Sequence, residues 1–324
     1  MTTITARRAA RRALEGLALG DAFGERWFKR FRPPQEALDQ IGRRRTPEEP
    51  EWRWTDDTAM ALCVYRTLLD DGGVNRNRLA AMFGAGLLAD PARGYGHGMY
   101  RLLPVLAERP GSWAQEAVEL FDGEGSLGNG AAMRVAPLGA WFAADLDEAA
   151  EQARYSAEVT HAHPEGIAGA VAVAVAAALA ARGGEPADRA GESADRAGVP
   201  GGAPAGAELL HEVADRTPEG PVRDGVRAAA DLSPATAPGR AAELLGSGRR
   251  MRASDTVPFA LWSAARHLDS LTDALWTTAE GLGDVDTTCA ITGGVVAART
   301  GLAGVPAQWL ERREPLPAWV AEEG

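Results

Sequence analysis

Cysteine is nearly absent from the 324-residue sequence, which contains only Cys63 and Cys289. Because these two residues lie far apart, each within an apolar run, neither a disulfide framework nor a cysteine-ligated zinc site is expected. We interpret both as small buried residues of a protein in the reducing cytoplasm.

Positive charge is also scarce, since 34 Lys and Arg residues face 45 Asp and Glu residues and the net charge is −11. Nucleic acids and anionic membranes need clustered cations, so neither is expected as a partner. A phosphate-bearing small ligand remains compatible with this composition, because a helix N-terminus or a single arginine can bind phosphate locally.

Long hydrophobic runs are equally rare. The longest apolar run, residues 166–181, is rich in alanine and shorter than the roughly 20 residues of a membrane span, so we expect a buried core helix there. The N-terminal residues carry charges and no uninterrupted apolar stretch, and no signal peptide is expected.

Helical periodicity dominates the patterns that are present. Aromatic residues make up only 6% of the chain and few segments alternate with period two, which disfavours strands. An all-α fold is therefore expected, in a single domain over residues 1–324. Period-3.6 patterns predict helices over residues 7–24, 58–69, 77–89, 113–121, 146–158, 166–182, 261–267, 271–282 and 288–299.

One segment departs from this pattern. Residues 183–208 repeat the letters ADRAG, are rich in glycine and proline, and lack aromatic and large aliphatic side chains. Such a composition buries too little apolar surface to order itself, so we expect a flexible low-complexity insertion between helices. A second loop-rich stretch, residues 29–51, carries four prolines and ends at the motif described next.

Asp56 and Asp57 stand side by side between Thr55 and Thr58, in WTDDTAM, directly before an apolar helical run. A helix N-cap needs only one such residue, and a carboxylate there gains about 0.3–1 kcal/mol from the helix dipole. Taken alone, the stretch is explained by capping. Two carboxylates with two hydroxyls nevertheless exceed what a cap requires.

The stretch GDVDTT, residues 283–288, has a similar arrangement, with Asp284 and Asp286 followed by Thr287 and another predicted helix. If the two motifs meet in space, their four aspartates repel one another unless hard cations lie between them. Oxygen ligands without His or Cys favour Mg²⁺, Ca²⁺ or Mn²⁺ over zinc. The metal site therefore depends on a contact between two distant segments.

Two glycine-rich stretches suit close approach to a ligand. In SLGNGAAM, residues 126–133, Gly128 and Gly130 flank Asn129 and allow backbone N–H groups to face a bound molecule. In RGYGHG, residues 93–98, glycines surround Tyr95 and His97, whose rings could stack on a base. Both stretches are also compatible with ordinary loops between helices.

A stripe of small residues occurs near the N-terminus, where Gly16, Gly20 and Gly24 recur at every fourth position. On a helix this spacing places all three on one face, which predicts close packing against a second helix. Asp21 lies within the same segment and would face whatever this stripe lines.

Two histidines occur in THAHPEG, residues 160–166, and could in principle serve a metal. His161 and His163 are only two positions apart and a proline follows, which matches no common zinc spacing. We expect a helix to begin here, with His163 either structural or lining the pocket.

The combination of these stretches resembles the ADP-ribosylglycohydrolase family, which includes the dinitrogenase reductase-activating glycohydrolases. The resemblance rests, in family order between residues 16 and 298, on GLALGDAFG, WTDDTAMAL, RGYG, GNGAAMRVAPLG, THAHPEG and GDVDTTCAITGGVVAA. It implies an all-α orthogonal helical bundle whose central cleft holds two divalent cations, Mg²⁺ or Mn²⁺.

The resemblance also implies roles for individual residues. The implied metal ligands are Thr55, Asp56, Asp57, Asp284, Asp286 and Thr287. The catalytic residues would be Asp56, Asp57, Asp286 and Glu25. The expected substrate-binding residues are Tyr95, Gly96, Gly128, Asn129, Gly130, Ala131, Met133 and His163.

The implied activity is hydrolysis of the glycosidic bond of an arginine- or serine-linked ADP-ribosylated substrate, with release of ADP-ribose. We expect ADP-ribose or an ADP-ribosylated protein as the partner and a monomeric protein. Two alternatives remain open: a hydrolase of a small derivative such as O-acetyl-ADP-ribose, and a catalytically silent ADP-ribose binder.

One position departs from the family pattern. Family members often carry a glutamate seven residues after the aspartate of GD, and Phe28 stands at that position here. Glu25 lies one turn earlier, which puts the usual assignment of the catalytic acid and base in doubt.

Overall fold

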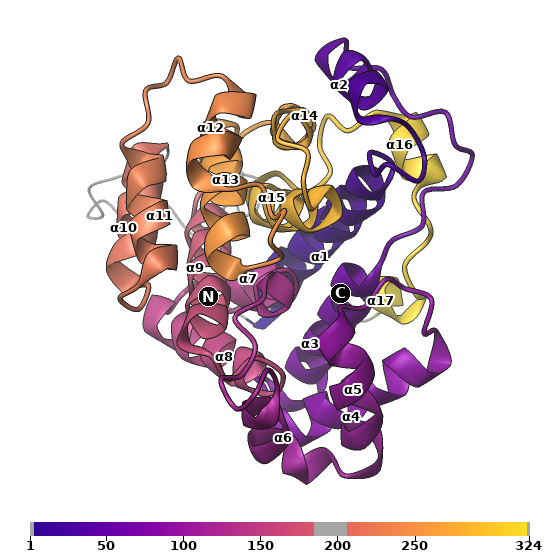
Figure 1. The fold of residues 1–324 in the computed structure, drawn as a ribbon, viewed down its shortest axis with the longest axis vertical. Coiled ribbons are helices and arrows are strands. Elements are labelled where there is room, and N and C mark those ends of the chain that lie inside the picture. The colour runs from indigo at the N-terminus through magenta and orange to yellow at the C-terminus, as the bar shows by residue number, and fades with distance from the viewer. Residues whose placement is uncertain (1–2, 185–205, 323–324) are drawn as a thin grey trace.

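The computed structural model describes residues 3–184 and 206–322, and this part of the chain is built of helices without strands (Figure 1). The expected all-α fold is confirmed. The α-helices are α1 (Thr3–Glu25), α2 (Pro34–Gly42), α3 (Asp56–Asp71), α4 (Arg76–Ala89), α5 (His97–Glu108), α6 (Trp113–Glu119), α7 (Ala136–Trp141), α8 (Leu146–Glu158), α9 (Pro164–Arg182), α10 (Ala207–Arg216), α11 (Pro221–Ala230), α12 (Pro238–Leu245), α13 (Ala253–Arg266), α14 (Leu271–Ala279), α15 (Val285–Thr300), α16 (Ala307–Arg312) and α17 (Trp319–Glu322). Two 3₁₀ turns, η1 (Pro110–Ser112) and η2 (Asn129–Ala131), complete the set.

Helices α1 and α15 pack antiparallel against each other through the predicted glycine stripe. A Cβ built on Gly16 would lie 2.1 Å from the Cβ of Ala297, and one on Gly20 would lie 2.0 Å from the carbonyl oxygen of Cys289. These distances are far below van der Waals contact, so only glycine permits this approach. The stripe therefore brings the end of α1 beside the beginning of α15.

Helix α9 runs through the core between α7, α8, α13 and α15. It is long and apolar enough to cross a membrane by composition alone, but most of it is buried inside the molecule. The prediction of a buried core helix over residues 166–181 is confirmed. Its first turn is capped by His163, whose ring nitrogen accepts a hydrogen bond from the backbone N–H of Glu165 at 3.1 Å.

Helix α3 owes its position to the motif before it. Thr55 is in an extended conformation at the N-cap, and Asp56 and Asp57 form the first turn. The helix ends at Gly72, which has a φ of 73° and donates a backbone hydrogen bond to the carbonyl of Leu68 at 3.0 Å. This left-handed C-cap conformation is one that glycine adopts without strain.

Some helices lie where loops were expected. Helix α2 occupies the proline-rich stretch 29–51, with Pro34 at its first position, where a missing N–H costs nothing. Helix α5 begins within RGYGHG at His97 and contains Pro104. Most of the expected insertion, residues 185–205, lies outside the described residues, whereas Ala207 and Glu208 open α10.

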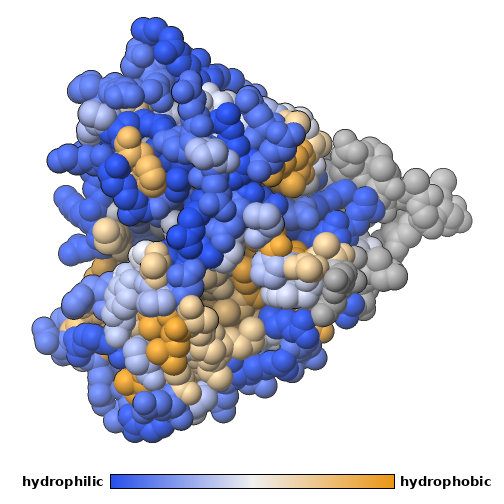
Figure 2. All heavy atoms as spheres, turned by 90° about the vertical axis from the view of Figure 1, so that its right-hand side faces the viewer, coloured by the Kyte–Doolittle hydropathy of each residue, from blue (hydrophilic) through white to orange (hydrophobic). Residues whose placement is uncertain are grey.

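The surface is mainly hydrophilic on the face seen in Figure 2, with hydrophobic side chains gathered in its lower half. Large exposed apolar side chains in the described residues include Leu88, Tyr100 and Phe121, which are 60%, 45% and 50% exposed. Phe121 also lines the pocket at which the two aspartate motifs meet.

Candidate functional site

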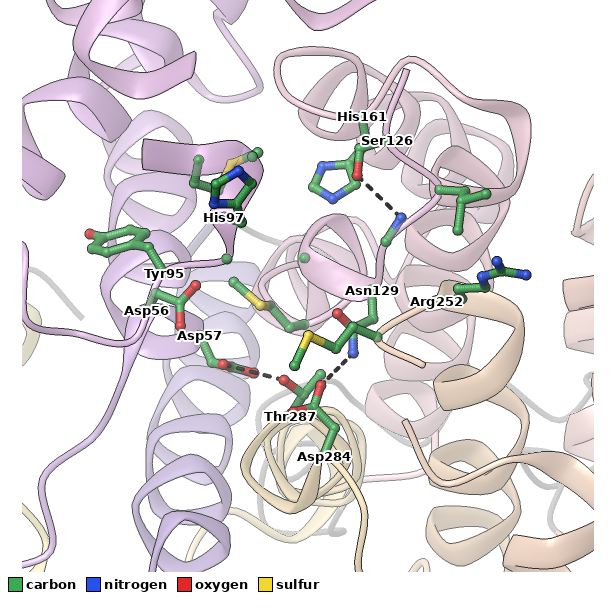
Figure 3. A pocket seen from close by; sticks show the side chains of 18 of the residues that line it. Asp56, Asp57, Tyr95, His97, Ser126, Asn129, His161, Arg252, Asp284 and Thr287 are labelled. Carbon is green, nitrogen blue, oxygen red and sulfur yellow. Dashed lines mark hydrogen bonds between the residues drawn. The ribbon is translucent and has the colours of Figure 1, made fainter. Parts of the chain in front are cut away.

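The two aspartate motifs meet at one pocket of about 670 Å³. Asp56 and Asp57 reach it from the first turn of α3, and Asp284, Asp286 and Thr287 reach it from the start of α15. The hydroxyl of Thr287 donates to Asp57 Oδ2 at 3.5 Å, across 230 positions of sequence (Figure 3). The condition on which the metal hypothesis depended, that both segments share one site, is therefore met.

Three of the expected metal ligands and substrate-binding residues lie outside the pocket lining. Thr55 is buried behind Asp57, and its hydroxyl oxygen lies 3.1 Å from Asp57 Oδ2. Ala131 is fully buried in η2, and His163 caps α9. The other substrate-binding residues that were expected do line the pocket, namely Tyr95, Gly96, Gly128, Asn129, Gly130 and Met133.

Asp21 is the support of the first motif, a role that the sequence did not assign to it. Its fully buried carboxylate accepts hydrogen bonds from the backbone N–H and hydroxyl groups of both Thr55 and Thr58, at 2.5–3.1 Å. The side chain of Asp21, carried by α1, thus replaces the usual N-cap of α3. It fixes the turn that presents Asp56 and Asp57 to the pocket.

Burial and mutual repulsion raise the pKa values of the pocket carboxyl groups. Burial raises the pKa of Asp56 to about 8, with a further contribution from the charge of Asp21. The pKa values of Asp57 and Asp286 lie well above the usual range, first because of burial and then because of neighbouring aspartates. The pKa of Asp284 is also raised by burial, while the amide of Asn129, which donates to its Oδ2 at 2.7 Å, opposes the rise.

The chemistry of these side chains fits a hard divalent cation. Oδ1 of Asp57 is buried and has no hydrogen-bond partner among the described residues. Every candidate ligand is a carboxylate or hydroxyl oxygen, as Mg²⁺ and Mn²⁺ prefer. Across residues 3–184 and 206–322, however, no three His, Cys, Asp or Glu side chains are already spaced as a metal cluster. The donor set is thus present without preformed coordination geometry.

The glycine-rich turn is held by a buried arginine. Arg134 is fully buried, and its guanidinium donates to the carbonyls of Gly130 at 3.3 Å and Ser156 at 2.6 Å and to the hydroxyl of Thr160 at 2.9 Å. Burial lowers its pKa to about 9. Arg134 therefore ties η2, which carries Asn129, to the end of α8.

Of the two candidate histidines, His161 lines the pocket. Its Nδ1 lies 2.7 Å from the hydroxyl of Thr160, and a Cβ on Gly130 would lie 3.2 Å from its Nε2. Burial lowers the pKa of His161 to about 3, so the ring is neutral at pH 7. The expectation that His163 lines the pocket is corrected: its ring caps α9, and His161 is the histidine in the pocket lining.

Glu25 does not reach the pocket. It lies at the end of α1 with an ion pair to Arg30 and a longer one of 3.9 Å to Arg26. It is absent from the pocket lining, as is Phe28. The carboxylates that do line the pocket, and not Glu25, are therefore the available acids and bases.

The RGYG segment anchors the first motif from the opposite side. The carbonyl of Arg93 accepts a hydrogen bond from the N–H of Asp56 at 2.8 Å, and its guanidinium donates to the carbonyl of Trp54, also at 2.8 Å. Both guanidinium ends pair with Glu314 at 2.7 Å. Arg93 thereby joins the chain near its C-terminus to the motif.

Part of the pocket wall was missed by the sequence reasoning. Arg250, Met251 and Arg252, in the segment between α12 and α13, line the pocket, as do Phe121 and Glu124. The only available signal was the cluster of arginines in GRRMR, residues 248–252, within an acidic chain. Nothing in that cluster indicated that it lies beside Asn129.

Similarity to one family of known proteins extends over nearly the whole chain. The family model described as ADP-ribosylglycohydrolase matches residues 2–322. The chain is 36% identical over 131 residues to ADP-ribosylhydrolase ARH3 from Gallus gallus, covering 40% of this chain and 35% of that protein. It is 32% identical over 182 residues to ADP-ribosylhydrolase ARH3 from Bos taurus, covering 53% and 50%.

These matches span only about a third to a half of the length of the curated relatives. A solved structure titled "ADP-ribosylglycohydrolase-related protein complex" superposes with a TM-score of 0.58 at 22% sequence identity, covering 99% of this chain and 95% of the other. That likeness supports the fold alone. The match to the family model covers nearly the whole chain.

Proposed function

Because the chain belongs to the ADP-ribosylglycohydrolase family, we propose that it hydrolyses the glycosidic bond that joins ADP-ribose to an acceptor group. One observation carries the proposal: the aspartates of α3 and α15 line the same pocket, linked by the hydrogen bond from Thr287 to Asp57. A pocket of about 670 Å³ is in the usual range for a ligand of nucleotide size.

Divalent cations, Mg²⁺ or Mn²⁺, belong to this proposal. The residues that would hold them are Asp56, Asp57, Asp284, Asp286 and Thr287, with Thr55 supporting Asp57 from behind. When bound, the cations would offset the repulsion among the carboxylates and orient the ribose hydroxyls. The unpartnered Oδ1 of Asp57 and the oxygen-only side chains support this assignment.

The chemical roles follow from what the chain places in the pocket. Glycosidic cleavage passes through an oxocarbenium-like state, whose positive charge the pocket carboxylates stabilise. We assign Asp286 the role of base: it takes a proton from the water that attacks the anomeric carbon, and the acceptor group leaves with the bonding electron pair. Asn129 orients Asp284 through its amide, and Tyr95 bounds the other side of the pocket.

A second candidate substrate is a small ester such as O-acetyl-ADP-ribose. The observation that favours it is the ion pair of Glu25 with Arg30, since this glutamate is then unavailable to protonate a leaving group. Acetate departs as a stable anion and needs no such acid, whereas the guanidine of arginine or the hydroxyl of serine departs more readily once protonated.

The test is release of ADP-ribose from three substrates: arginine-linked and serine-linked ADP-ribosylated protein and O-acetyl-ADP-ribose. Each is assayed with Mg²⁺, with Mn²⁺ and with excess chelator. We expect cation-dependent release that Asp286→Asn lowers at least 100-fold, while Asp71→Asn, at the exposed end of α3, leaves the rate unchanged. If no substrate is cleaved but ADP-ribose binds, the chain is a silent binder and the catalytic proposal is wrong.

A further inference from the structure

The arginine loop, residues 248–252, forms part of the pocket wall that the family motifs do not cover. Arg250 and Arg252 line the pocket, and both residues are exposed to solvent. Figure 3 shows Arg252 on the side of the pocket opposite Tyr95 and His97, beyond Asn129. This loop therefore faces a ligand from the far side of the glycine-rich turn.

Backbone hydrogen bonds hold the arginine loop in place. The carbonyl of Met251 accepts from the N–H of Asn129 at 3.1 Å, and the N–H of Ala253 donates to the carbonyl of Leu127 at 3.0 Å. The N–H of Arg250 donates to Asp255 Oδ2 at 2.8 Å. Because the loop is tied to the glycine-rich turn on both sides of Arg252, its backbone is preorganised.

The loop also fits closely against the acidic part of the site. The N–H of Asp284 donates to the carbonyl of Ser247 at 2.9 Å, and a Cβ on Gly248 would lie 2.4 Å from the Cβ of Asp284. Gly248 has a φ of 81°, so it both adopts the left-handed turn and leaves room for the aspartate. The arginines and the aspartates are thus fixed relative to each other.

Neither pocket guanidinium has an acidic partner. Among the described residues, no carboxylate oxygen lies within 4.0 Å of a guanidinium nitrogen of Arg250 or Arg252. By contrast, other arginines of this acidic chain, such as Arg93 and Arg154, make ion pairs. Guanidinium groups bind phosphate with paired hydrogen bonds, so two free ones in a pocket wall suit a phosphate ligand.

We propose that Arg250 and Arg252 form a phosphate subsite that determines the binding orientation of the substrate. This inference rests on the proposed function. Asp56 and Asp57, which suit the ribose hydroxyls and the reacting bond, lie on one side of the pocket, and Arg252 lies on the other (Figure 3). A nucleotide substrate therefore binds with a phosphate at the arginine loop and its reacting ribose at the aspartates. The phosphate belongs either to the diphosphate of ADP-ribose or to a further phosphate on its adenosine.

The experiment measures dissociation constants by calorimetry at low and at physiological ionic strength. The probes are ADP-ribose, ADP-ribose with an added 2′-phosphate, and inorganic pyrophosphate. The variants are Arg250→Gln and Arg252→Gln, with Arg249→Gln as the matched control, because Arg249 belongs to the same loop and is exposed but does not line the pocket. A melting temperature for each variant confirms that it is folded.

We expect each pocket variant to bind at least one nucleotide about tenfold more weakly than wild type, the loss of one charge-assisted contact. Weaker binding of ADP-ribose assigns the diphosphate to the subsite, and weaker binding of the 2′-phosphorylated form alone assigns the added phosphate. The defect should shrink as salt rises. Equal affinities in both pocket variants and the Arg249→Gln control overturn the inference.

Binding measurements on the wild-type protein distinguish failure of the proposed function from failure of the phosphate subsite. If wild type binds neither nucleotide, the proposed function is wrong, and pyrophosphate then decides about the subsite. If wild type binds pyrophosphate and both Arg250→Gln and Arg252→Gln abolish this binding, the phosphate subsite is supported although the protein binds neither nucleotide. Absence of pyrophosphate binding as well overturns the inference together with the function.

Discussion

The pocket carboxylates should couple cation binding to stability and to pH. With a cation present at about a hundred times its dissociation constant, mass action adds about 2.7 kcal/mol to the free energy of unfolding. For 324 residues, with an unfolding entropy of about 2.1 cal/mol/K per residue, this corresponds to a rise in melting temperature of about 4 °C. We expect this rise with Mg²⁺ or Mn²⁺ at pH 8, relative to excess chelator.

The same rise should almost vanish at pH 6. Because the pKa of Asp56 is raised to about 8, its proton must leave before a cation binds, so each pH unit below 8 weakens binding about tenfold. At the same cation concentration the rise then falls below about 1 °C. Without cations, stability depends on pH in the opposite direction. The folded protein then binds more protons than the unfolded chain, so the free energy of unfolding declines as pH rises from about 4 to 8.

Differential scanning fluorimetry at pH 6 and pH 8, with cation or chelator, measures both effects. Asp57→Asn should remove the cation-dependent rise, and without cations it should melt no lower than wild type at pH 8, because a neutral amide replaces a buried carboxyl group that is surrounded by other carboxyl groups. Asp71→Asn, on the exposed last turn of α3, should behave as wild type. The reasoning is refuted if the melting temperature is the same with cation and with chelator at both pH values, or if the cation raises it equally at pH 6 and pH 8.

Three other substitutions test the supports of the site. Asp21→Asn cannot accept all the hydrogen bonds from Thr55 and Thr58, and should lower the free energy of unfolding by about 2 kcal/mol in urea denaturation, together with the rate of ADP-ribose release. Arg134→Lys keeps the charge but loses the planar fork that joins Gly130 to Ser156, and should cost about 2 kcal/mol in the same titration. Asn129→Ala frees Asp284 from its amide partner and should raise the KM for substrate several-fold with little change in melting temperature.

The fold class followed from the sequence, because alanine-rich segments with period 3.6 leave little room for strands. Each of the nine predicted helices overlaps an observed one, and three of them, 113–121, 261–267 and 271–282, run one to three residues past its end. Helix α5 was missed because it follows Gly94 and Gly96 and contains Gly98 and Pro104, all of which argue against a helix locally. Its burial of Leu103 and Leu106 in the core outweighs that local preference.

The candidate site was predictable only in part. The paired aspartates stood out because they exceed what a helix cap needs, but their meeting depends on the packing of α1 with α15. The role of Asp21 was not visible, since its hydrogen-bond partners lie 34 and 37 positions away. The arginine loop joins the glycine-rich turn through hydrogen bonds between segments more than 120 positions apart, which no local pattern encodes.

The glycine stripe therefore determines the positions of the pocket aspartates as well as the packing of the core. Two substitutions separate these effects. A Cβ on Gly24 would lie 2.4 Å from the carbonyl oxygen of Val285 and 2.7 Å from the Cα of Asp286, so Gly24→Ala must displace the start of α15 from α1. Gly16→Ala creates a clash of similar severity, 2.1 Å from the Cβ of Ala297, near the other end of α15.

Both substitutions should lower stability to urea by a comparable amount, in the range of about 1–3 kcal/mol typical of overpacking. Only Gly24→Ala should also weaken cation binding, because it moves Asp286 relative to Asp57, whereas Gly16→Ala leaves the beginning of α15 in place. Titration of each folded variant with Mn²⁺ by calorimetry separates the two effects. Equal cation affinities in the two variants would show that the carboxylates adjust independently of the helix packing, and that the stripe serves the core alone.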